Sequence, residues 1–279
     1  MRDLAAHPEL LSLNTATVRE RWNLEQIIEG CARRGIRAIS PWRDQVATIG
    51  LARAAQLIRT HGMRLSGYCR GGMFPAADAA GRLRAREDNR RALDEALTLG
   101  AECLVLVVGG LPQGSKDIAG ARLQVEEGIA WLLEQSRVAG MKLAIEPLHP
   151  MYAADRACVN TLAQANDMCE RLGDGVGVAV DVYHVWWDPA LEAEIARAGR
   201  AGRILAHHVC DWLVPTTDLL LDRGMMGDGV IDLPRIRGWV EGAGYAGAVE
   251  VEIFSAANWW KRDPDDVLKV VKERYRTVC

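Results

Sequence analysis

Four potential metal ligands stand at the ends of four successive apolar runs in the second half of the chain. The runs KLAIE, VGVAVD, ILAHH and AVEVE end at Glu146, Asp181, His207–His208 and Glu252. If these runs are parallel strands of a barrel, their carboxyl ends share one face, and the four side chains meet there. Ionisable groups gathered at the mouth of an apolar barrel are costly without a compensating cation. The spacing therefore predicts one divalent metal ion.

The donor set indicates which ions would fit. Three carboxylates and one imidazole are rich in oxygen, which suits Mn²⁺, Mg²⁺ or Co²⁺ and also admits Zn²⁺. Any one of these side chains alone has an ordinary explanation, as a solvated strand end or a hydrogen-bonded core histidine. Four consecutive strands that all end in a ligand favour a metal site.

Alternation along the seventh run selects between the two adjacent histidines. Side chains two residues apart in a strand lie on the same face of the sheet. If Ile204 and Ala206 point into the barrel, His208 does so as well and His207 points away. We therefore expect His208 to be the ligand.

Further polar residues follow these strand ends. His184 comes three residues after Asp181, Asp211 comes three residues after His208, and Arg223 opens a glycine-rich stretch at residues 223–232. His184 has two open interpretations, a substrate contact or a supporting loop residue. Arg223 is either a substrate contact or a partner in a surface salt bridge.

Tryptophan is unusually frequent and unevenly placed, with nine tryptophans against two phenylalanines. Aromatic walls stack on sugar rings and on aromatic ligands, and they are also enriched at oligomer interfaces. We expect both uses, with Trp186 and Trp212 among the substrate contacts. Six tryptophans follow predicted strands: Trp42, Trp186, Trp187, Trp212, Trp259 and Trp260.

A repeated unit predicts how these residues are positioned. An amphipathic helical pattern, a glycine and a short apolar run recur seven times, and an opening strand at residues 10–13 makes eight. Glycine suits the position after a helix end, and runs of Val, Ile, Leu and Ala without strict alternation suit parallel strands buried on both faces. The repeat predicts a single (β/α)₈ TIM barrel over residues 1–279. An open doubly wound sheet is the alternative, but no GxGxxG follows an early strand. The junction glycines are Gly35, Gly62, Gly100, Gly140, Gly173, Gly202 and Gly247.

Loop lengths agree with this arrangement. The turns from helix to strand are short, whereas the strand-to-helix loops at residues 70–85, 147–159, 212–233 and 253–264 are long. In a barrel these long loops lie at the carboxyl ends of the strands, where active sites are built.

Composition excludes several classes of protein. The chain has 279 residues, of which 49% are hydrophobic and 25% charged, so it is neither disordered nor fibrous. A net charge of −3 disfavours a nucleic-acid partner, and no apolar run reaches the roughly 20 residues of a membrane span. Seven cysteines without a CxxC pair and the lack of a signal peptide indicate reduced thiols in a cytoplasmic protein.

Taken together, the motifs resemble the xylose-isomerase-like TIM-barrel superfamily of sugar isomerases and epimerases. The matching pieces lie in the second half of the chain, while the first half matches only in its rhythm of strands and helices. They are Glu146-Pro147, Asp181-x-x-His184, His208-x-x-Asp211, the stretch 223–232, and Gly244-Tyr-Ala-Gly247 followed by Glu252.

The resemblance implies a role for each matching residue. Glu146, Asp181, His208 and Glu252 would bind one divalent ion, with Mn²⁺ the first expectation. As in the ketose 3-epimerases of this group, Glu146 and Glu252 would also transfer the protons. His184 and Arg223 would hold substrate oxygens. The residues Leu148-His149-Pro150, which follow Glu146-Pro147, depart from the tagatose- and psicose-epimerase type.

The expected function is a metal-dependent isomerase or epimerase that acts on a ketose or keto-polyol through a stabilised enediolate. The partner would be a small carbohydrate, and a homo-oligomer is compatible with the aromatic loops. A dehydratase or lyase of a keto-sugar or inosose on the same site is the alternative. An endonuclease IV-like repair enzyme is disfavoured by six histidines and the negative charge. A non-catalytic sugar-binding barrel is a further alternative.

Overall fold

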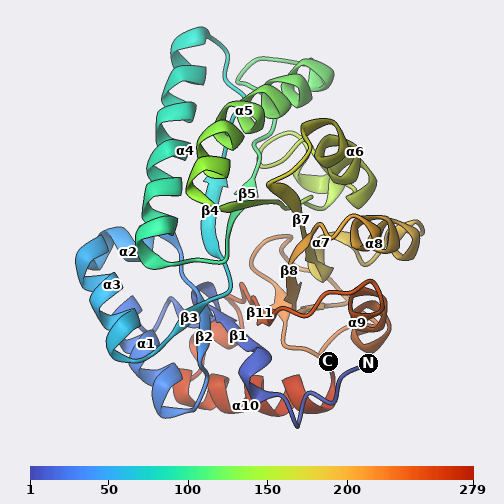
Figure 1. Ribbon diagram of the computed structural model, residues 1–279. Coiled ribbons are helices and arrows are strands. Elements are labelled where there is room, and N and C mark those ends of the chain that lie inside the picture. Colours follow the sequence, from blue (N-terminus) through green and yellow to red (C-terminus); the bar gives the residue numbers. More distant parts are fainter.

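The computed structural model describes residues 1–279 and shows parallel strands wound into a barrel with helices outside it (Figure 1). Nine strands form the sheet in the order β3-β2-β1-β11-β8-β7-β6-β5-β4, and every pair of neighbours in it is parallel. A separate antiparallel pair, β9 and β10, lies in the loop after β8. The sheet strands are β1 Leu11–Asn14, β2 Ala38–Ser40, β3 Arg64–Leu65, β4 Tyr68–Gly72, β5 Cys103–Val107, β6 Lys142–Ile145, β7 Val176–Asp181, β8 Ile204–Val209 and β11 Val249–Val251. The antiparallel strands are β9 Asp211–Trp212 and β10 Arg223–Gly224.

The two ends of the sheet meet, because β3 and β4 are successive pieces of the third predicted strand. Leu65 in β3 pairs with Ala101 just before β5, while Trp42 just after β2 pairs with Cys69 in β4. β3 and β4 thus each pair with the β2 side of the sheet and with the β5 side. Together they fill the place of one strand, and the barrel is nearly closed. The expected (β/α)₈ TIM barrel is confirmed.

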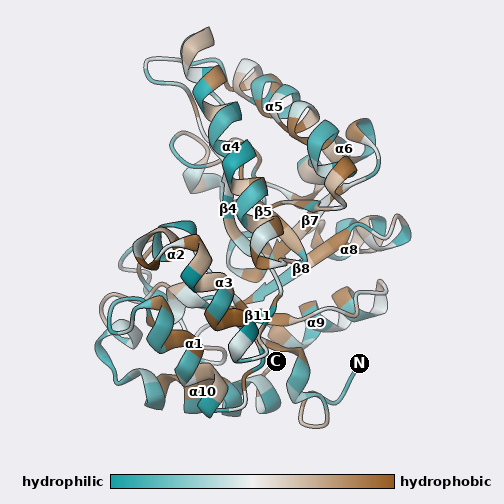
Figure 2. Cartoon of the chain, turned by 60° about the vertical axis from the view of Figure 1, so that its left-hand side comes forward, coloured by the Kyte–Doolittle hydropathy of each residue, from teal (hydrophilic) through white to brown (hydrophobic).

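Helices cover the outside of the barrel (Figure 2), and their buried apolar residues belong to the same core cluster as those of the strands. Local sequence accounts for several of their ends. Asn23 and Gln26 form a capping box at the start of α1, and the Thr161 hydroxyl accepts the Gln164 backbone N–H at the start of α6. Gly100 ends α4 in the left-handed conformation. The α-helices are α1 Leu24–Arg33, α2 Arg43–Ile49, α3 Leu51–Thr60, α4 Ala79–Leu99, α5 Ile118–Ala139, α6 Leu162–Leu172, α7 Val182–Val185, α8 Leu191–Arg200, α9 Leu233–Gly242 and α10 Pro264–Thr277. Short 3₁₀ helices span Pro8–Leu10, Thr15–Val18, Pro150–Tyr152 and Trp259–Lys261.

The core has two parts. A cluster of 70 buried residues fills the space around the strands and under the helices. A small second cluster consists of short side chains: Cys69, Cys103, Val105, Ala144, Ala179 and Ala206. Ala206 therefore faces the barrel interior, as the alternation along β8 requires for His208 to do the same.

Small differences from the expected elements concern their ends. The first predicted long loop is shorter than residues 70–85, because α4 already begins at Ala79. The seventh strand continues past His208 to Val209. All seven cysteines are buried and unpaired, and no helix combines the length and apolar character that a membrane crossing requires.

We expect Gly72→Ala to lower the free energy of unfolding by more than about 2 kcal/mol. Gly72 has φ of +112°, and an added Cβ would lie 1.9 Å from the carbonyl oxygen of Val107 on the neighbouring strand. Gly100→Ala is the matched control, because Gly100 also has positive φ but has open space around it. That control should cost only about 1 kcal/mol. Urea unfolding of both variants measures the difference, and equal losses would contradict the steric explanation.

Candidate functional site

The structure brings the four predicted ligands together at the carboxyl ends of four strands. Glu146 directly follows β6, Asp181 ends β7, His208 lies near the end of β8 and Glu252 directly follows β11. One potential ligand atom from each side chain lies within 4.8 Å of all the others, and all four residues are buried. The parallel strands thus convert a regular sequence spacing into a compact cluster of three carboxylates and one imidazole.

His208 is held between carboxylates at both ring nitrogens. Its Nδ1 lies 2.9 Å from Glu146 Oε1, and its Nε2 lies 3.6 Å from Glu250 Oε1 without a hydrogen bond. His207 points the other way, toward the Val180 carbonyl oxygen at 3.2 Å. The expected choice of His208 over His207 agrees with this geometry.

Glu250 lies in the barrel interior and is itself fixed by two donors. Asn14 Nδ2 donates to Glu250 Oε1 at 2.8 Å, and Ser66 Oγ donates to Oε2 at 2.8 Å. The Asn14 amide also donates to Glu252 Oε1 at 2.8 Å. A carboxylate that faces the far nitrogen of a histidine fixes the ring and its tautomer, as carboxylates behind metal-binding histidines do.

Arg223 reaches the cluster from the loop after β8. Its Nη1 donates to Asp181 Oδ2 at 3.2 Å and to Glu252 Oε2 at 3.0 Å. Its Nη2 lies 3.2 Å from His184 Nε2, and its guanidinium lies over the ring of Tyr183 at 4.3 Å from the centroid. The side chain is buried, so a surface salt bridge is excluded as its role.

The cluster holds more negative charge than its neighbours balance. Burial alone would raise the pKa of Asp181, but the positive charge of Arg223 holds it below its usual value. Burial alone would lower the pKa of His208, but Glu250 and Glu146 raise it well above its usual value. Burial raises the pKa of Glu252. The carboxylates therefore favour an added positive charge, whether a proton or a cation.

His184 is kept neutral on the edge of the cluster. Burial lowers the pKa of its imidazole to about 3. The His149 backbone N–H donates to Nδ1 at 3.2 Å, and the rings of Tyr152 and Tyr183 pack against it edge-on. His184 can therefore hold an oxygen atom of a ligand through hydrogen bonds rather than through charge.

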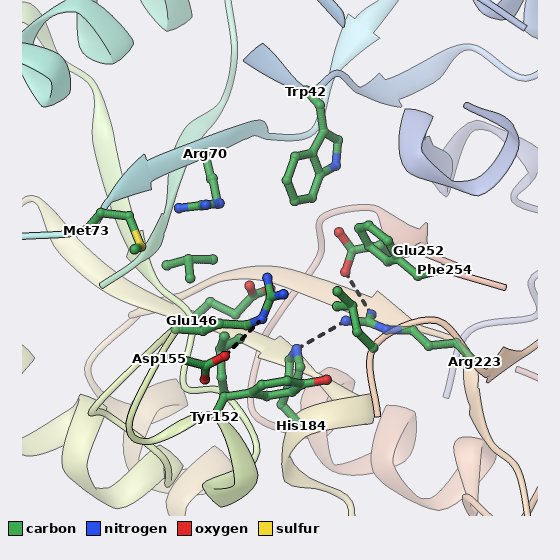
Figure 3. A pocket seen from close by; sticks show the side chains of 14 residues that line it. Trp42, Arg70, Met73, Glu146, Tyr152, Asp155, His184, Arg223, Glu252 and Phe254 are labelled. Carbon is green, nitrogen blue, oxygen red and sulfur yellow. Dashed lines mark hydrogen bonds and ion pairs between the residues drawn. The ribbon is translucent and has the colours of Figure 1, made fainter. Parts of the chain in front are cut away.

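A cavity of about 290 Å³ opens directly above the cluster (Figure 3). Glu146, Glu252, His184 and Arg223 line it, together with aromatic, apolar and charged side chains from several loops. These other lining residues are Trp42, Arg70, Met73, Val107, Leu148, Tyr152, Asp155, Arg156, Leu220 and Phe254. The cavity has the mixture of apolar walls and a few polar groups that is typical of small-molecule sites.

Two of the expected substrate contacts lie elsewhere. Trp186 and Trp212 do not line the cavity. Trp212 stacks on His149 at a ring separation of 5.1 Å and packs against Tyr183 and Trp186. Among the six tryptophans that follow strands, Trp42 is the one that lines the cavity.

Asp211 is also outside the ligand cluster. Its carboxylate accepts the backbone N–H groups of Trp212, Gly227 and Ile231 at 2.8 to 3.0 Å. Asp211 thus organises the glycine-rich loop that carries Arg223.

The sequence reasoning missed Glu250, Asn14 and Arg70. Glu250 had a readable signal, because it lies two residues before Glu252 on the same strand and so on the same face. Asn14 ends the first strand, which places it on the same barrel face as the ligands. Arg70 offered no signal beyond its place at the start of a long loop.

The fold agrees with comparisons to known proteins. The chain belongs to the xylose isomerase-like TIM barrel family, whose model matches residues 26–272. It is 64% identical to protein SMc04130 from Sinorhizobium meliloti 1021, whose crystal structure matches with a TM-score of 0.96 over 98% of this chain and 99% of that chain.

Two further relatives carry descriptive names. A segment of 151 residues is 28% identical to an inosose isomerase of Halalkalibacterium halodurans, and it covers 51% of this chain and 50% of the relative. The chain thus spans about half the length of this curated relative. The crystal structure of the IolI protein with a bound zinc atom matches with a TM-score of 0.81 at 21% identity, over 94% of this chain and 95% of that chain. At this identity the likeness shows the shared fold.

We expect stability to fall between pH 6.5 and pH 4, partly because of His207. Burial lowers the pKa of His207 to about 4, whereas a histidine in the unfolded chain titrates near 6.5. Between these values the unfolded chain binds a proton that the folded chain does not. The contribution of neutral His207 to the free energy of unfolding is therefore complete above pH 6.5. It decreases by about 1.4 kcal/mol per pH unit as the pH falls toward 4.

Urea unfolding of His207→Phe at several pH values tests this expectation. The variant should show a shallower loss than the wild type over this range, while the matched variant His61→Phe should keep the wild-type slope. An unchanged slope in His207→Phe would show that this imidazole does not resist protonation in the folded state.

Proposed function

We propose that the protein is a divalent-metal-dependent isomerase or epimerase of a ketose or keto-polyol. The observation that carries this proposal is the buried cluster of Glu146, Asp181, His208 and Glu252 at the floor of a cavity. Such a cluster suits a reaction in which negative charge develops on a substrate oxygen while protons move between carbon atoms.

The residues present fit a divalent cation. They offer three carboxylates and one imidazole, and the cluster favours additional positive charge, as the raised pKa of His208 indicates. Glu146, Asp181, His208 and Glu252 would hold the ion. When bound, the ion supplies Lewis-acid polarisation of the ketone and stabilises the enediolate that follows proton removal. We propose Mn²⁺ first, and Zn²⁺ is supported by the zinc atom bound to the related IolI fold.

Glu146 and Glu252 are the candidates for proton transfer. They come from strands separated by β7 and β8 in the sheet, and both line the cavity. One carboxylate would remove the proton next to the ketone, and the other would return a proton to the opposite face of the same carbon. Return to the adjacent carbon would give isomerisation instead. Burial favours the protonated form of Glu252, which supports unequal roles for the two acids.

His184 and Arg223 are the candidates for holding substrate oxygens. Both line the cavity, and their nitrogen atoms lie 3.2 Å apart. A neutral imidazole and a charged guanidinium side by side can orient two neighbouring hydroxyl or carbonyl oxygens. The relation to an inosose isomerase supports a keto-polyol as one substrate type to test.

We expect Glu252→Gln to abolish proton exchange without unfolding the protein. The amide has nearly the same shape as the carboxylate but cannot accept the transferred proton. The assay incubates Mn²⁺-loaded protein in D₂O with 2-keto-myo-inositol and a panel of ketoses, and it measures deuterium incorporation by mass spectrometry. The exposed Glu127→Gln, on α5, is the matched control and should exchange at the wild-type rate. Exchange in Glu252→Gln would remove this residue from proton transfer, and no exchange by the wild type on any compound would overturn the proposed function.

We expect Glu250→Gln to weaken metal binding by about 10- to 100-fold. The change removes the carboxylate that faces His208 Nε2 but leaves all four proposed ligands in place. Isothermal titration calorimetry with Mn²⁺ and Zn²⁺ measures the affinity directly, so the result does not depend on the substrate. Glu127→Gln again serves as the control. An unchanged affinity would show that Glu250 does not position His208 for metal binding.

A further inference from the structure

Arg70 is a charged side chain of the cavity that has no partner in the protein. It comes from β4, and its guanidinium reaches into the same cavity as Glu146 and His184 (Figure 3). The guanidinium forms no hydrogen bond or ion pair with another residue, although the side chain is largely withdrawn from solvent. Several other buried or half-buried arginines pair with carboxylates, as in Arg43 with Asp88 and Glu95, Arg223 with Asp181 and Glu252, and Arg237 with Glu241.

The backbone at Arg70 contains a β-bulge. Cys69 pairs with Val105 and Gly71 pairs with Leu106, so Arg70 is the extra residue with no partner on β5. A bulge changes the direction of a side chain, and bulges are frequent at barrel rims next to active sites. Here the bulge directs Arg70 toward the cavity.

A buried asparagine and two glycines hold this bulge. Asn89 on α4 accepts the Gly72 backbone N–H at 2.6 Å and donates to the Gly72 carbonyl oxygen at 2.7 Å. An added Cβ at Gly71 would lie 2.8 Å from Asn89 Oδ1. Arg70 is thus presented by a defined piece of backbone rather than by a loose loop.

A second guanidinium, that of Arg156, lines the same cavity from the loop after β6. Its one ion-pair partner is the adjacent Asp155, at 3.8 Å, whose side chain is 66% exposed. Burial and the nearby charge of Arg156 lower the pKa of Arg70, so the two cations disfavour each other. An anion that lies against both would relieve this repulsion.

Neutral ligands satisfy this arrangement poorly. Sugar hydroxyls can accept hydrogen bonds from a guanidinium, but they bring no negative charge to Arg70, which forms no ion pair with the carboxylates that line the same cavity. A carboxylate or phosphate matches the planar fork of arginine and forms charge-assisted hydrogen bonds with it. The volume of about 290 Å³ limits the ligand to a small molecule such as a monosaccharide derivative.

We propose that the substrate is an anionic keto-sugar, whose carboxylate or phosphate is bound by Arg70 and Arg156 while its ketone lies at the four-ligand cluster. This proposal rests on the proposed function and names its substrate class. The guanidiniums would select the substrate by its charged end, and the cluster would carry out the proton transfers.

Matched ketoses that differ only at C6 test the proposal. D-Fructose, D-fructuronate and D-fructose 6-phosphate carry a hydroxymethyl, a carboxylate and a phosphate, and D-tagatose with its uronate and 6-phosphate forms a second series. For full-length Mn²⁺-loaded protein, we expect at least one anionic member of a series to bind about 10- to 100-fold more tightly than the neutral ketose. Calorimetry measures affinity, and deuterium exchange in D₂O measures turnover. The stronger of the two anionic members identifies which group the site prefers.

Variants of Arg70 separate charge recognition from a structural role. Arg70→Gln should weaken binding of the anionic ketose about 10- to 100-fold more than binding of the neutral ketose, while Arg70→Lys should retain part of the preference. Arg90→Gln is the matched control, because Arg90 is an exposed residue of α4 that pairs only with Asp94 at 4.0 Å. Since Arg70 has no protein partner, Arg70→Gln should unfold at the wild-type temperature or above it.

The outcomes distinguish the two proposals. An anionic preference that is lost in Arg70→Gln, without exchange on any ketose, would support the anion site and overturn the proposed function. Exchange without an anionic preference would support the function and overturn the anion site. Equal losses for neutral and anionic ketoses in Arg70→Gln would also overturn it, as would the absence of binding by every member of both series.

Discussion

Burial of several carboxylates around one imidazole is the constraint on which this structure depends. Glu146, Asp181, Glu250 and Glu252 all lie within a few ångströms of His208 or Arg223 at the mouth of an otherwise apolar barrel. Carboxylates withdrawn from water are stable only when positive charge or hydrogen bonds compensate them. Arg223 from the loops and Asn14 from the first strand supply part of that compensation, and a cation would supply the rest. The buried carboxylates therefore favour the binding of a positive charge at the carboxyl ends of these strands.

The position of the carboxylate cluster was predictable, because residues that end successive parallel strands of a barrel lie close together in space. Residues that end consecutive strands must lie on one face of a barrel, whatever the helices between them look like. The choice of His208 over His207 needed only the two-residue period of a strand and the inward direction of Ala206. Glu250 follows from the same rule, because it lies two residues before Glu252 and so on the same inward face, although it does not end the strand.

The loops were less predictable, because no periodicity governs them. Trp186 and Trp212 follow strands that end in ligands, yet neither lines the cavity. Trp212 packs on His149 and Tyr183, and Trp186 packs on Trp212. Their direction depends on long-range packing between loops. Arg70 depends on a bulge that Asn89 fixes from a helix almost twenty residues later, and neither its register shift nor its direction is visible in the sequence.

The cavity keeps its opposite charges apart. Arg70 and Glu146 line the same space, yet they form no ion pair, and the bulge and its glycines hold the guanidinium where it is. A charge that is largely withdrawn from water and has no partner costs the free protein stability, and an ion of opposite charge that binds there offsets part of that cost. Separated charges of opposite sign impose a direction on whatever enters, because a ligand with a negative end and an electron-poor carbonyl fits in one orientation only. Natural sites commonly retain such unfavourable arrangements where binding relieves them. The unpaired Arg70 therefore fits the proposed binding of an anionic ligand.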